Sequence, residues 1–256
     1  MMIKSLQWNI GGGIIRNKED DPFMDNSYRV SNLNYIADFI KKLDPDLITL
    51  QETHASSELI QAELLSRLTG LHYWVNDAYD HSHLEAGQRL GQAILSKYPI
   101  QEHTFELFYN PKYKVERPNG ETWFSHDKGL SKCKIEINGV PVEIQTLHLI
   151  PFRTFTIDPM SDQAQTVREN ITKKIHSSFD RIILQGDFNI NQESLHTFIP
   201  DVFEIGFDEI LSDRATTPAG CRYDHILFKG FQVKSMNVFQ TALTDHYPVS
   251  VEFETK

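Results

Sequence analysis

The stretch ILQGDFNI at residues 183–190 begins as an apolar strand and ends in polar side chains. Residues 182–184 are aliphatic and belong in a core, whereas Asp187 and Asn189 are a carboxylate and an amide two positions apart. Side chains at i and i+2 of a strand lie on one face, so the two would face the same side if the strand continues. Gly186 is expected to let the backbone turn tightly there. The stretch therefore predicts a core strand with two polar groups at its tip.

The composition is that of an ordinary globular protein. The chain has 256 residues, of which 40% are apolar and 23% charged, and this length allows one large α/β domain with a sizeable core. We find no internal repeat, low-complexity segment or linker-like tract. These features favour a single domain over residues 1–256.

The charge and the cysteines narrow the class of protein further. The formal net charge is −10, with no dense Lys/Arg run, which argues against tight binding of long duplex nucleic acid. A local basic groove or a metal ion would still allow contact with phosphates. Cys133 and Cys221 are far apart in the chain and are expected to be reduced thiols.

No apolar run is long enough to span a membrane, and the first residues read as a strand rather than a signal peptide. We therefore expect a soluble, cytoplasmic protein without membrane insertion.

Strands and helices alternate early in the chain, and strands dominate later. Helices are predicted where apolar residues recur at helical spacing, at residues 28–43, 57–68 and 161–177. Strands are predicted at residues 3–9, 46–52, 91–96, after Pro99, and at 129–137, 140–149, 180–189, 223–228, 231–239 and 247–253. Asn138-Gly139 predicts a hairpin between two of these strands. Hairpins exclude an all-parallel sheet, so we expect an α/β fold with mixed sheets.

Several predicted strands carry a polar group at one end. The groups at C-terminal tips are Asn9, Glu52, His148, Asp187 and Asn189, and those at strand starts are Asp224, Asp245 and His246. An antiparallel strand begins at the edge where its neighbours end, so all these groups can converge on one rim of the sheet. Glu52 shares strand parity with Ile48 and Leu50, and a carboxylate on that core face is costly unless it is paired or binds a cation.

The chemistry of such a cluster points to phosphoester hydrolysis. Carboxylate, amide and water oxygens suit Mg²⁺ or Mn²⁺. Histidines and further carboxylates add proton transfer and charge stabilisation, and a bound divalent ion polarises a phosphoryl oxygen. Taken singly, each residue has an ordinary structural explanation, such as a turn, a cap or a hydrogen-bonded core histidine. Their recurrence at strand tips favours a common site, although spacing alone leaves metal binding without catalysis open.

Taken in order, the segments WNI, LQE, AILSKYPI, TLHL, GDFN, YDHILF and TDHYPV resemble the endonuclease/exonuclease/phosphatase superfamily, which includes deoxyribonuclease I-like nucleases. The segments run from residue 8 to residue 249, so the resemblance covers nearly the whole chain. It implies a four-layer α/β/β/α sandwich of two mixed sheets flanked by helices. The site would lie at one edge of the paired sheets.

The resemblance also implies a metal site. Glu52 would be the main ligand of Mg²⁺ (or Mn²⁺), with Asn9 beside it. Asp245 would support the metal or the substrate phosphate.

The resemblance implies five catalytic residues. Asp187 would position or deprotonate the attacking water, and Asn189 would hold that water or the phosphate. Asp224 and His246 would form a hydrogen-bonded carboxylate–imidazole pair. His148 would stabilise the phosphate or donate a proton to the leaving oxygen.

Three loops between the matched segments are expected to shape the substrate pocket. They span residues 72–91, 108–128 and 151–159, and their aromatic and basic side chains could stack a base, bind a second phosphate, or simply pack the loops. Arg153 is the best candidate for a substrate contact because it follows the strand of His148. The other loop residues of this kind are His72, Tyr73, Trp74, Tyr79, His81, His83, Arg89, Tyr113, Arg117, Trp123, His126 and Lys128.

Three functions remain open from the sequence. The first is a metal-dependent phosphodiesterase acting on nucleic acid, single-stranded or end-specific rather than long duplex. The second is a phosphatase or phosphodiesterase for a small-molecule or lipid phosphoester. The third is a non-catalytic binding module. The complete set of polar residues predicted at the strand ends argues against this third function. No apolar membrane loop favours a lipid substrate, and we expect a monomer.

Overall fold

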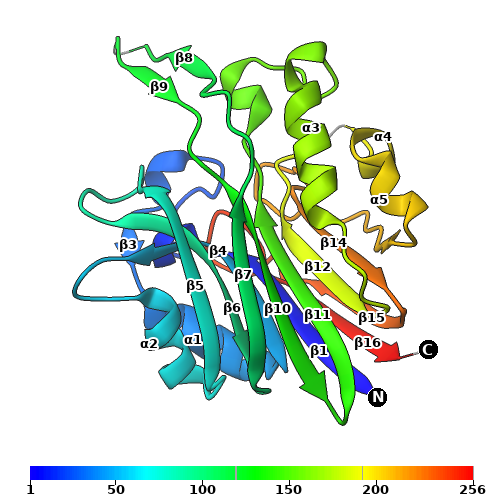
Figure 1. Cartoon of the computed structure of the whole chain (residues 1–256). Coiled ribbons are helices and arrows are strands. Elements are labelled where there is room, and N and C mark those ends of the chain that lie inside the picture. Colours follow the sequence, from blue (N-terminus) through cyan, green and yellow to red (C-terminus); the bar gives the residue numbers. More distant parts are fainter. Residues whose placement is uncertain (119, 192, 256) are drawn as a thin grey trace.

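Two six-stranded mixed sheets pack face to face (Figure 1). The computed structural model describes residues 1–118, 120–191 and 193–255. In the first sheet the order is β15 (Phe231–Val238), β16 (Val249–Thr255), β1 (Met2–Asn9), β4 (Leu47–Ala55), β6 (Arg89–Ser96) and β5 (Tyr73–His81). In the second it is β13 (Asp208–Glu209), β14 (Asp224–Lys229), β12 (Ile182–Asp187), β11 (Val140–His148), β10 (Gly129–Ile137) and β7 (Ile100–Leu107).

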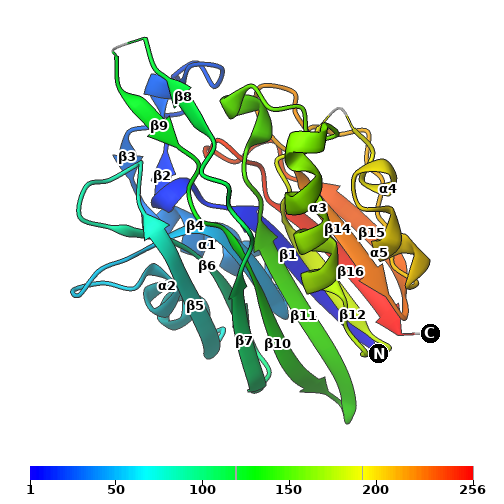
Figure 2. The same cartoon turned by 45° about the horizontal axis from the view of Figure 1, so that its top comes forward.

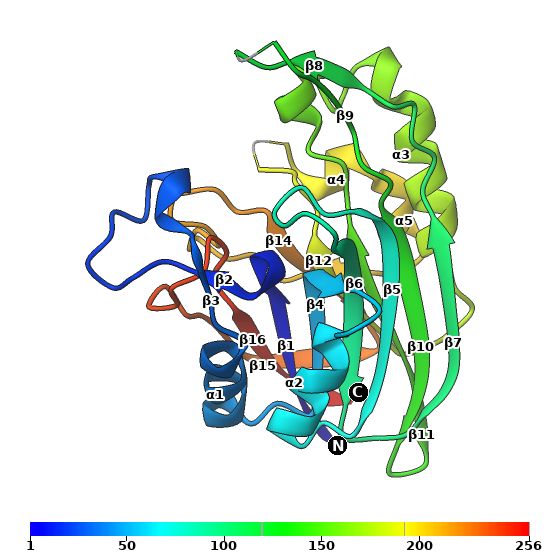
Figure 3. The same cartoon turned by 90° about the vertical axis from the view of Figure 1, so that its left-hand side faces the viewer.

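Helices cover the outer faces of both sheets, as the side view in Figure 3 shows. The first sheet is flanked by α1 (Leu33–Leu43) and α2 (Gln61–Thr69), and the second by α3 (Asp162–Ile175), α4 (Leu195–Phe198) and α5 (Pro200–Glu204). Short 3₁₀ turns are η1 (Gly11–Gly13), η2 (Asp25–Ser27) and η3 (Phe152–Phe155). Two small strand pairs complete the described elements, β2 (Ile14–Ile15) with β3 (Val30–Ser31) and β8 (Lys114–Glu116) with β9 (Thr122–Phe124). The predicted α/β/β/α architecture is confirmed.

The helix predicted at residues 28–43 begins later, because its first residues are used elsewhere. Val30 pairs with Ile15 in the β2–β3 ladder. Asn32 then caps the helix, since its side chain accepts a hydrogen bond of 3.0 Å from the Tyr35 backbone N–H. Likewise α2 begins at Gln61 rather than residue 57, after a short bridge that follows β4.

Both faces of β12, inside the second sheet, are buried. Ile182 and Leu184 of β12 belong to a core with α3, whereas Ile183 packs into the core between the sheets. The helix contributes the four residues that its periodicity predicts, Ala164, Val167, Ile171 and Ile175. The Asn138-Gly139 hairpin joins β10 to β11 as expected.

Gly186 allows a close approach of two strands rather than a turn. It lies inside β12, which continues to Asp187, so the turn expected at Gly186 is wrong. A Cβ atom at this position would lie 2.2 Å from the carbonyl oxygen of Leu147 on β11. Only glycine permits the backbone spacing found here.

A polar layer joins the two sheets beneath the strand tips. Gln51 of β4 donates to Thr146 Oγ1 of β11 at 2.8 Å, and Gln7 of β1 donates to Asp224 Oδ1 of β14 at 3.1 Å. Buried amides need such partners, so each bond fixes the position of one sheet relative to the other. The layer ends at Asp224, one of the predicted catalytic residues.

Cys133 is buried and Cys221 is partly exposed, and among the described residues neither forms a disulfide. Within the described ranges, the helices are too short or too polar to cross a membrane.

Candidate active site

The predicted strand tips meet at one edge of the paired sheets, beneath the β8–β9 hairpin (Figure 2). His148, Asp187 and Asp224 are direct register neighbours across β11, β12 and β14. Asn9 ends β1 in the facing sheet, and its Nδ2 donates to Asp187 Oδ2 at 3.0 Å. Parallel neighbours end at the same edge, and antiparallel β14 begins there. The expected convergence of these residues is confirmed.

Glu52 reaches this edge because β4 contains a bulge. The pairing register of β4 with β6 shifts between Gln51 and Thr53, and Glu52 has a φ of 54°. Simple alternation would place Glu52 opposite Gln51, on the same face as Ile48 and Leu50. The bulge interrupts the alternation at Glu52, so the expected parity with Ile48 and Leu50 is wrong. The bulge turns the side chain into the site, where Glu52 Oε1 lies 3.9 Å from His148 Nε2.

Asn189 also reaches the site through left-handed backbone rather than strand alternation. The strand ends at Asp187, and Asn189 follows with a φ of 53°. Its backbone N–H donates to Asp187 Oδ1 at 2.9 Å, and its side chain donates to the Leu149 carbonyl at 3.0 Å. Asp187 and Asn189 are thus neighbours in the site, although no strand connects them.

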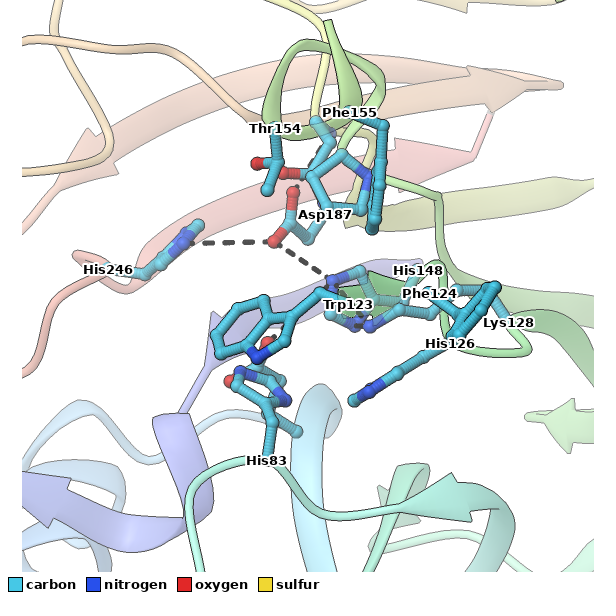
Figure 4. Close-up of a pocket in the computed structure, with 13 residues that line it drawn as sticks. His83, Trp123, Phe124, His126, Lys128, His148, Thr154, Phe155, Asp187 and His246 are labelled. Carbon is cyan, nitrogen blue, oxygen red and sulfur yellow. Dashed lines mark hydrogen bonds and ion pairs between the residues drawn. The ribbon is translucent and has the colours of Figure 1, made fainter. Parts of the chain in front are cut away.

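Asp187 is the centre of the cluster (Figure 4). Besides the bond from Asn9, its Oδ2 lies 3.4 Å from His148 Nε2 and 3.7 Å from His246 Nε2. Burial raises the pKa of Asp187 to about 6; the charge of Asp224 adds to the rise and that of His246 opposes it. Asp187 is therefore a carboxylate that titrates near neutral pH, as a proton acceptor requires.

Asp224 and His246 form the expected pair. Nδ1 of His246 lies 2.8 Å from Asp224 Oδ2. Burial lowers the pKa of His246, but the charges of Asp224, Asp187 and Asp245 outweigh burial and raise it well above its usual value. His246 is thus an imidazolium whose Nε2 faces the cavity. It lies in the turn before β16, which starts at Val249, so the expectation that His246 opens the last strand is wrong.

His148 has partners that its own strand does not reveal. Its Nδ1 lies 3.1 Å from the Tyr79 hydroxyl, and Lys128 Nζ lies 3.0 and 3.1 Å from the two ring nitrogens. Burial, followed by the charges of Lys128 and His246, lowers the pKa of His148 well below its usual value. The ring is therefore neutral at neutral pH.

The acidic residues at the rim fit a hard cation. Asp245 Oδ1 is buried without a hydrogen-bond partner among the described residues, and burial raises the pKa of Asp245 to about 6. A Cβ at Gly11 would lie 3.0 Å from that oxygen. In the described ranges, no three His, Cys, Asp or Glu side chains enclose a metal by themselves. An ion held by Glu52 and Asp245 would take most of its ligands from water, as Mg²⁺ does.

Glu52 is ionised despite its burial. Burial raises its pKa, but the charges of His83, Lys128 and His246 and a hydrogen bond from Asn9 outweigh burial and lower it. A buried carboxylate of this kind is a suitable metal ligand.

A cavity of about 140 Å³ lies over these residues. Five of the predicted residues line it, namely Glu52, His148, Asp187, Asn189 and His246. Asn9 and Asp224 stand behind them and bond to Asp187 and His246. Arg153 is not a lining residue; its side chain is 49% exposed and forms an ion pair with Glu193.

The opposite wall comes from the loops that the sequence singles out. Trp123 lies on β9 and His126 comes shortly after this strand, whereas His83 belongs to the loop after β5 (Figure 4). The guanidinium of Arg117 lies 3.4 Å from the centroid of the Trp123 ring, and His83 meets that ring edge-on at 6.4 Å. Phe124, Pro151, Thr154 and Phe155 also line the cavity; they lie in the loops 108–128 and 151–159 that are expected to shape the pocket, although none of them is named singly as a candidate. Their exposed or loop positions give no periodic signal.

Comparison with known proteins identifies the fold family. The sequence profile of the "Endonuclease/Exonuclease/phosphatase family" matches residues 6–246. No curated protein matches the chain.

Solved structures match nearly the full chain. An endonuclease/exonuclease/phosphatase from Beutenbergia cavernae DSM 12333 is 16% identical, with a TM-score of 0.75 over 99% of this chain and 72% of that chain. A mannosyl-6-phosphatase from Bacteroides thetaiotaomicron VPI-5482 is 16% identical, with a TM-score of 0.64 over 98% and 99%. The human Nocturnin catalytic domain, solved with a bound sulfate anion, is 13% identical, with a TM-score of 0.68 over 100% and 95%. At these identities the likeness concerns the fold alone.

Proposed function

Because the chain belongs to the endonuclease/exonuclease/phosphatase family, whose members are generally phosphoester hydrolases, we propose that it is a divalent-metal-dependent phosphodiesterase of nuclease-like type. The observation that carries the proposal is the contact of one carboxylate, Asp187, with Asn9, His148 and His246 at the floor of a cavity. This arrangement supports attack of water on phosphorus, because a proton acceptor and a cationic hydrogen-bond donor face the same space.

Asp187 acts on the nucleophile in this mechanism. Hydrogen bonds from Asn9 and the Asn189 backbone hold its carboxylate, so one oxygen can accept a proton from water. Its pKa of about 6 leaves it mostly ionised at neutral pH. Asn189 lines the cavity beside it and helps to hold the water or the phosphate.

The two histidines act on the phosphoryl group. The imidazolium of His246, held by Asp224, donates a hydrogen bond to a phosphoryl oxygen and stabilises the charge that develops there. His148 is neutral, which favours the role of hydrogen-bond donor over that of strong acid toward the leaving oxygen.

The rim residues would hold the metal. Glu52 and Asp245, with Asn9 beside them, would bind Mg²⁺ or Mn²⁺, which when bound polarises a phosphoryl oxygen. Asp245 Oδ1, which has no hydrogen-bond partner in the part of the chain that the structure describes, supports this assignment.

A phosphatase or phosphodiesterase for a small phosphoester is the second candidate. The cavity is small, about 140 Å³, and residues of β9 line one side of it. A structural relative is named a mannosyl-6-phosphatase, which is a statement about that protein. Both functions would use the same polar residues at the cavity floor. They differ in the substrate that the opposite wall of the cavity would accept.

The reaction is tested with bis(p-nitrophenyl) phosphate in Mg²⁺ or Mn²⁺. We expect hydrolysis that EDTA abolishes, and losses in kcat/KM of about 10²–10⁴-fold for Glu52→Gln and Asp187→Asn. The exposed residues Glu58 and Asp213 give matched controls, Glu58→Gln and Asp213→Asn, which should retain full activity. Equal turnover by all four variants would exclude the mechanism.

The substrate is tested with a panel under the same conditions. It contains plasmid DNA, oligonucleotides blocked at either end, RNA, nucleotides, inositol phosphates, sugar phosphates and sphingomyelin. A preference for single-stranded or end-accessible nucleic acid supports the first candidate. A salt-insensitive preference for a small phosphoester would replace it with the second.

A further inference from the structure

We propose that Lys128 binds a phosphoryl oxygen of the substrate, as a fixed cation beside the ring of His148. The inference rests on the proposed phosphoester substrate and adds a substrate-binding residue to the site. Lys128 stands just before β10, at the end of a loop between two elements of the site, and it lines the cavity.

Lys128 is a buried cation. Only 4% of the residue is exposed, and its Nζ lies 5.3 Å from the centroid of the Tyr79 ring. Among the described residues, no carboxylate lies within the 4.0 Å that defines an ion pair with it. A buried ammonium group is costly unless it is paired and hydrogen-bonded. The chain thus maintains an expensive charge beside the catalytic floor.

The hydrogen bonds of the ammonium group are incomplete. In the described ranges, Lys128 bonds only to the ring of His148. A neutral imidazole offers one acceptor nitrogen, and the Tyr79 hydroxyl also lies 3.1 Å from Nδ1. Since an ammonium group carries three donors, at least two remain without an acceptor among the residues that the structure describes. A phosphoryl oxygen entering the cavity can accept them.

The position of Lys128 fits a phosphate held over His148. Nε2 of His148 is 3.4 Å from Asp187 Oδ2 and 3.9 Å from Glu52 Oε1, and Lys128 Nζ lies 3.1 Å from this nitrogen and 3.0 Å from Nδ1. A phosphate above this ring has its phosphorus next to the water-binding carboxylate and one oxygen toward Lys128. Burial lowers the pKa of Lys128 to about 8, against the opposing charges of Glu52 and Asp187, so the group is still mostly protonated at neutral pH.

The oxygen could belong to the scissile phosphate or to a second phosphate on the same substrate. The chemistry of recognition is the same in both cases, a charge-assisted hydrogen bond from an ammonium group to a phosphoryl oxygen. A purely structural Lys128, which only balances the nearby carboxylates, would contribute nothing to anion binding.

Anion binding is measured directly on the full chain, by calorimetric titration of inorganic phosphate in EDTA. We expect wild-type protein to bind phosphate and Lys128→Met to bind it at least about tenfold more weakly, the effect of losing one charge-assisted bond. Lys128→Gln is titrated in parallel in case the first variant fails to fold by circular dichroism. Lys112, an exposed lysine between β7 and β8 that pairs with Asp127, gives the matched control Lys112→Met, which should bind as wild type does.

The outcomes separate the two proposals. Phosphate binding that is absent from wild type, or equal in wild type and the folded neutral variants of Lys128, would overturn the role of Lys128. Because the titration needs no turnover, a protein that binds phosphate through Lys128 but hydrolyses no ester would refute only the proposed function.

A kinetic arm identifies which phosphate is bound. Two oligonucleotides are compared, identical except that one carries a terminal phosphate next to the scissile bond. If Lys128→Met lowers kcat/KM equally for both oligonucleotides, Lys128 binds the scissile phosphate. If kcat/KM falls only for the oligonucleotide with the terminal phosphate, Lys128 binds that additional phosphate. No loss for either would contradict the proposal.

Discussion

Nδ1 of His246 lies 2.8 Å from Oδ2 of Asp224, and the other oxygen of that carboxylate accepts a bond from Gln7 in the facing sheet. One carboxylate therefore orients the catalytic imidazole and is itself oriented by the packing of the two sheets. The negative charge of Asp224 also makes the largest contribution to raising the pKa of His246, and so keeps the imidazole protonated. The chemistry of the site depends on how the two sheets are aligned.

Substitution Asp224→Asn should lower activity and narrow its pH range. His246 acts as a cation, so activity is lost as pH rises through its pKa, which Asp224 raises in the wild type. Removing that charge lowers the pKa, and the alkaline limb of the kcat/KM profile should move to lower pH. We expect kcat/KM at pH 7 to fall about 10²-fold or more. An unchanged alkaline limb would contradict the assignment, and the exposed variant Asp208→Asn serves as control.

Substitution Asp245→Asn should stabilise the metal-free protein at neutral pH. The pKa of Asp245 is raised from 3.8 to about 6 in the folded state, so its proton stabilises the fold below pH 3.8 and this contribution is lost as pH rises through 6. A shift of this size corresponds to a free energy of unfolding on the order of 3 kcal/mol. In EDTA at pH 7 the variant should therefore melt several degrees higher than wild type.

Metal provides the control for this variant. Mg²⁺ should raise the Tm of the wild type more than that of Asp245→Asn, because an ion that binds the folded state stabilises it through its ligands. Melting curves from pH 4 to pH 8, with and without Mg²⁺, measure both effects. Equal Tm values for the two proteins across this range would show that Asp245 is not the uncompensated carboxylate inferred here.

Substitution Gly186→Ala should destabilise the fold strongly. The added Cβ would lie 2.2 Å from the Leu147 carbonyl oxygen, and neither strand can move without disturbing the buried sheet. We expect the free energy of unfolding in urea to fall by about 3 kcal/mol or more, as in severe overpacking. Gly139 gives a matched control, because a Cβ there meets nothing within 4 Å. Gly139→Ala, at a φ of 78°, should cost only about 1–2 kcal/mol. Similar losses for both variants would exclude the clash as the cause.

Substitution Trp123→Ala should weaken substrate binding without removing the chemistry. Trp123 lines the cavity opposite Asp187, and Arg117 fixes its ring. If a base stacks there, KM for an oligonucleotide should rise about tenfold, because stacking on an aromatic ring is worth about 1–3 kcal/mol. The value of kcat should change little, since no floor residue is altered. Tyr109→Ala, at an exposed aromatic residue that does not line the cavity, should leave KM unchanged. An unchanged KM for Trp123→Ala would argue against stacking.

The sequence was sufficient to place most of the long strands and most of the catalytic floor, but β5 lies in residues 72–91, where a loop was expected. Asp187 and His148 continue the alternation of buried strands, and parallel neighbours necessarily end at one edge. The start of an antiparallel strand at that edge adds Asp224. These predictions hold because alternation and strand direction are local properties of the chain.

Glu52 and Asn189 were predicted as site residues, but for the wrong geometric reason. Both have left-handed backbone, with φ values of 54° and 53°, and neither position carries a glycine that would reveal it. The bulge in β4 depends on pairing with β6, and the turn after β12 depends on the bond to Asp187. Long-range contacts that local patterns do not record maintain this backbone.

The sequence by itself determined that Asn9, His148, Asp187 and Asp224 stand at strand ends, because hydrophobic alternation and strand ends are encoded over a few neighbouring positions. Only the tertiary structure decided which loop residues join them. Lys128 and Tyr79 lie far from His148 in the chain, yet both contact its ring. Their role follows from burial and from the absence of a carboxylate partner for Lys128 within the described residues. Such properties arise only when distant segments pack together, since the cost of a buried charge depends on everything that surrounds it.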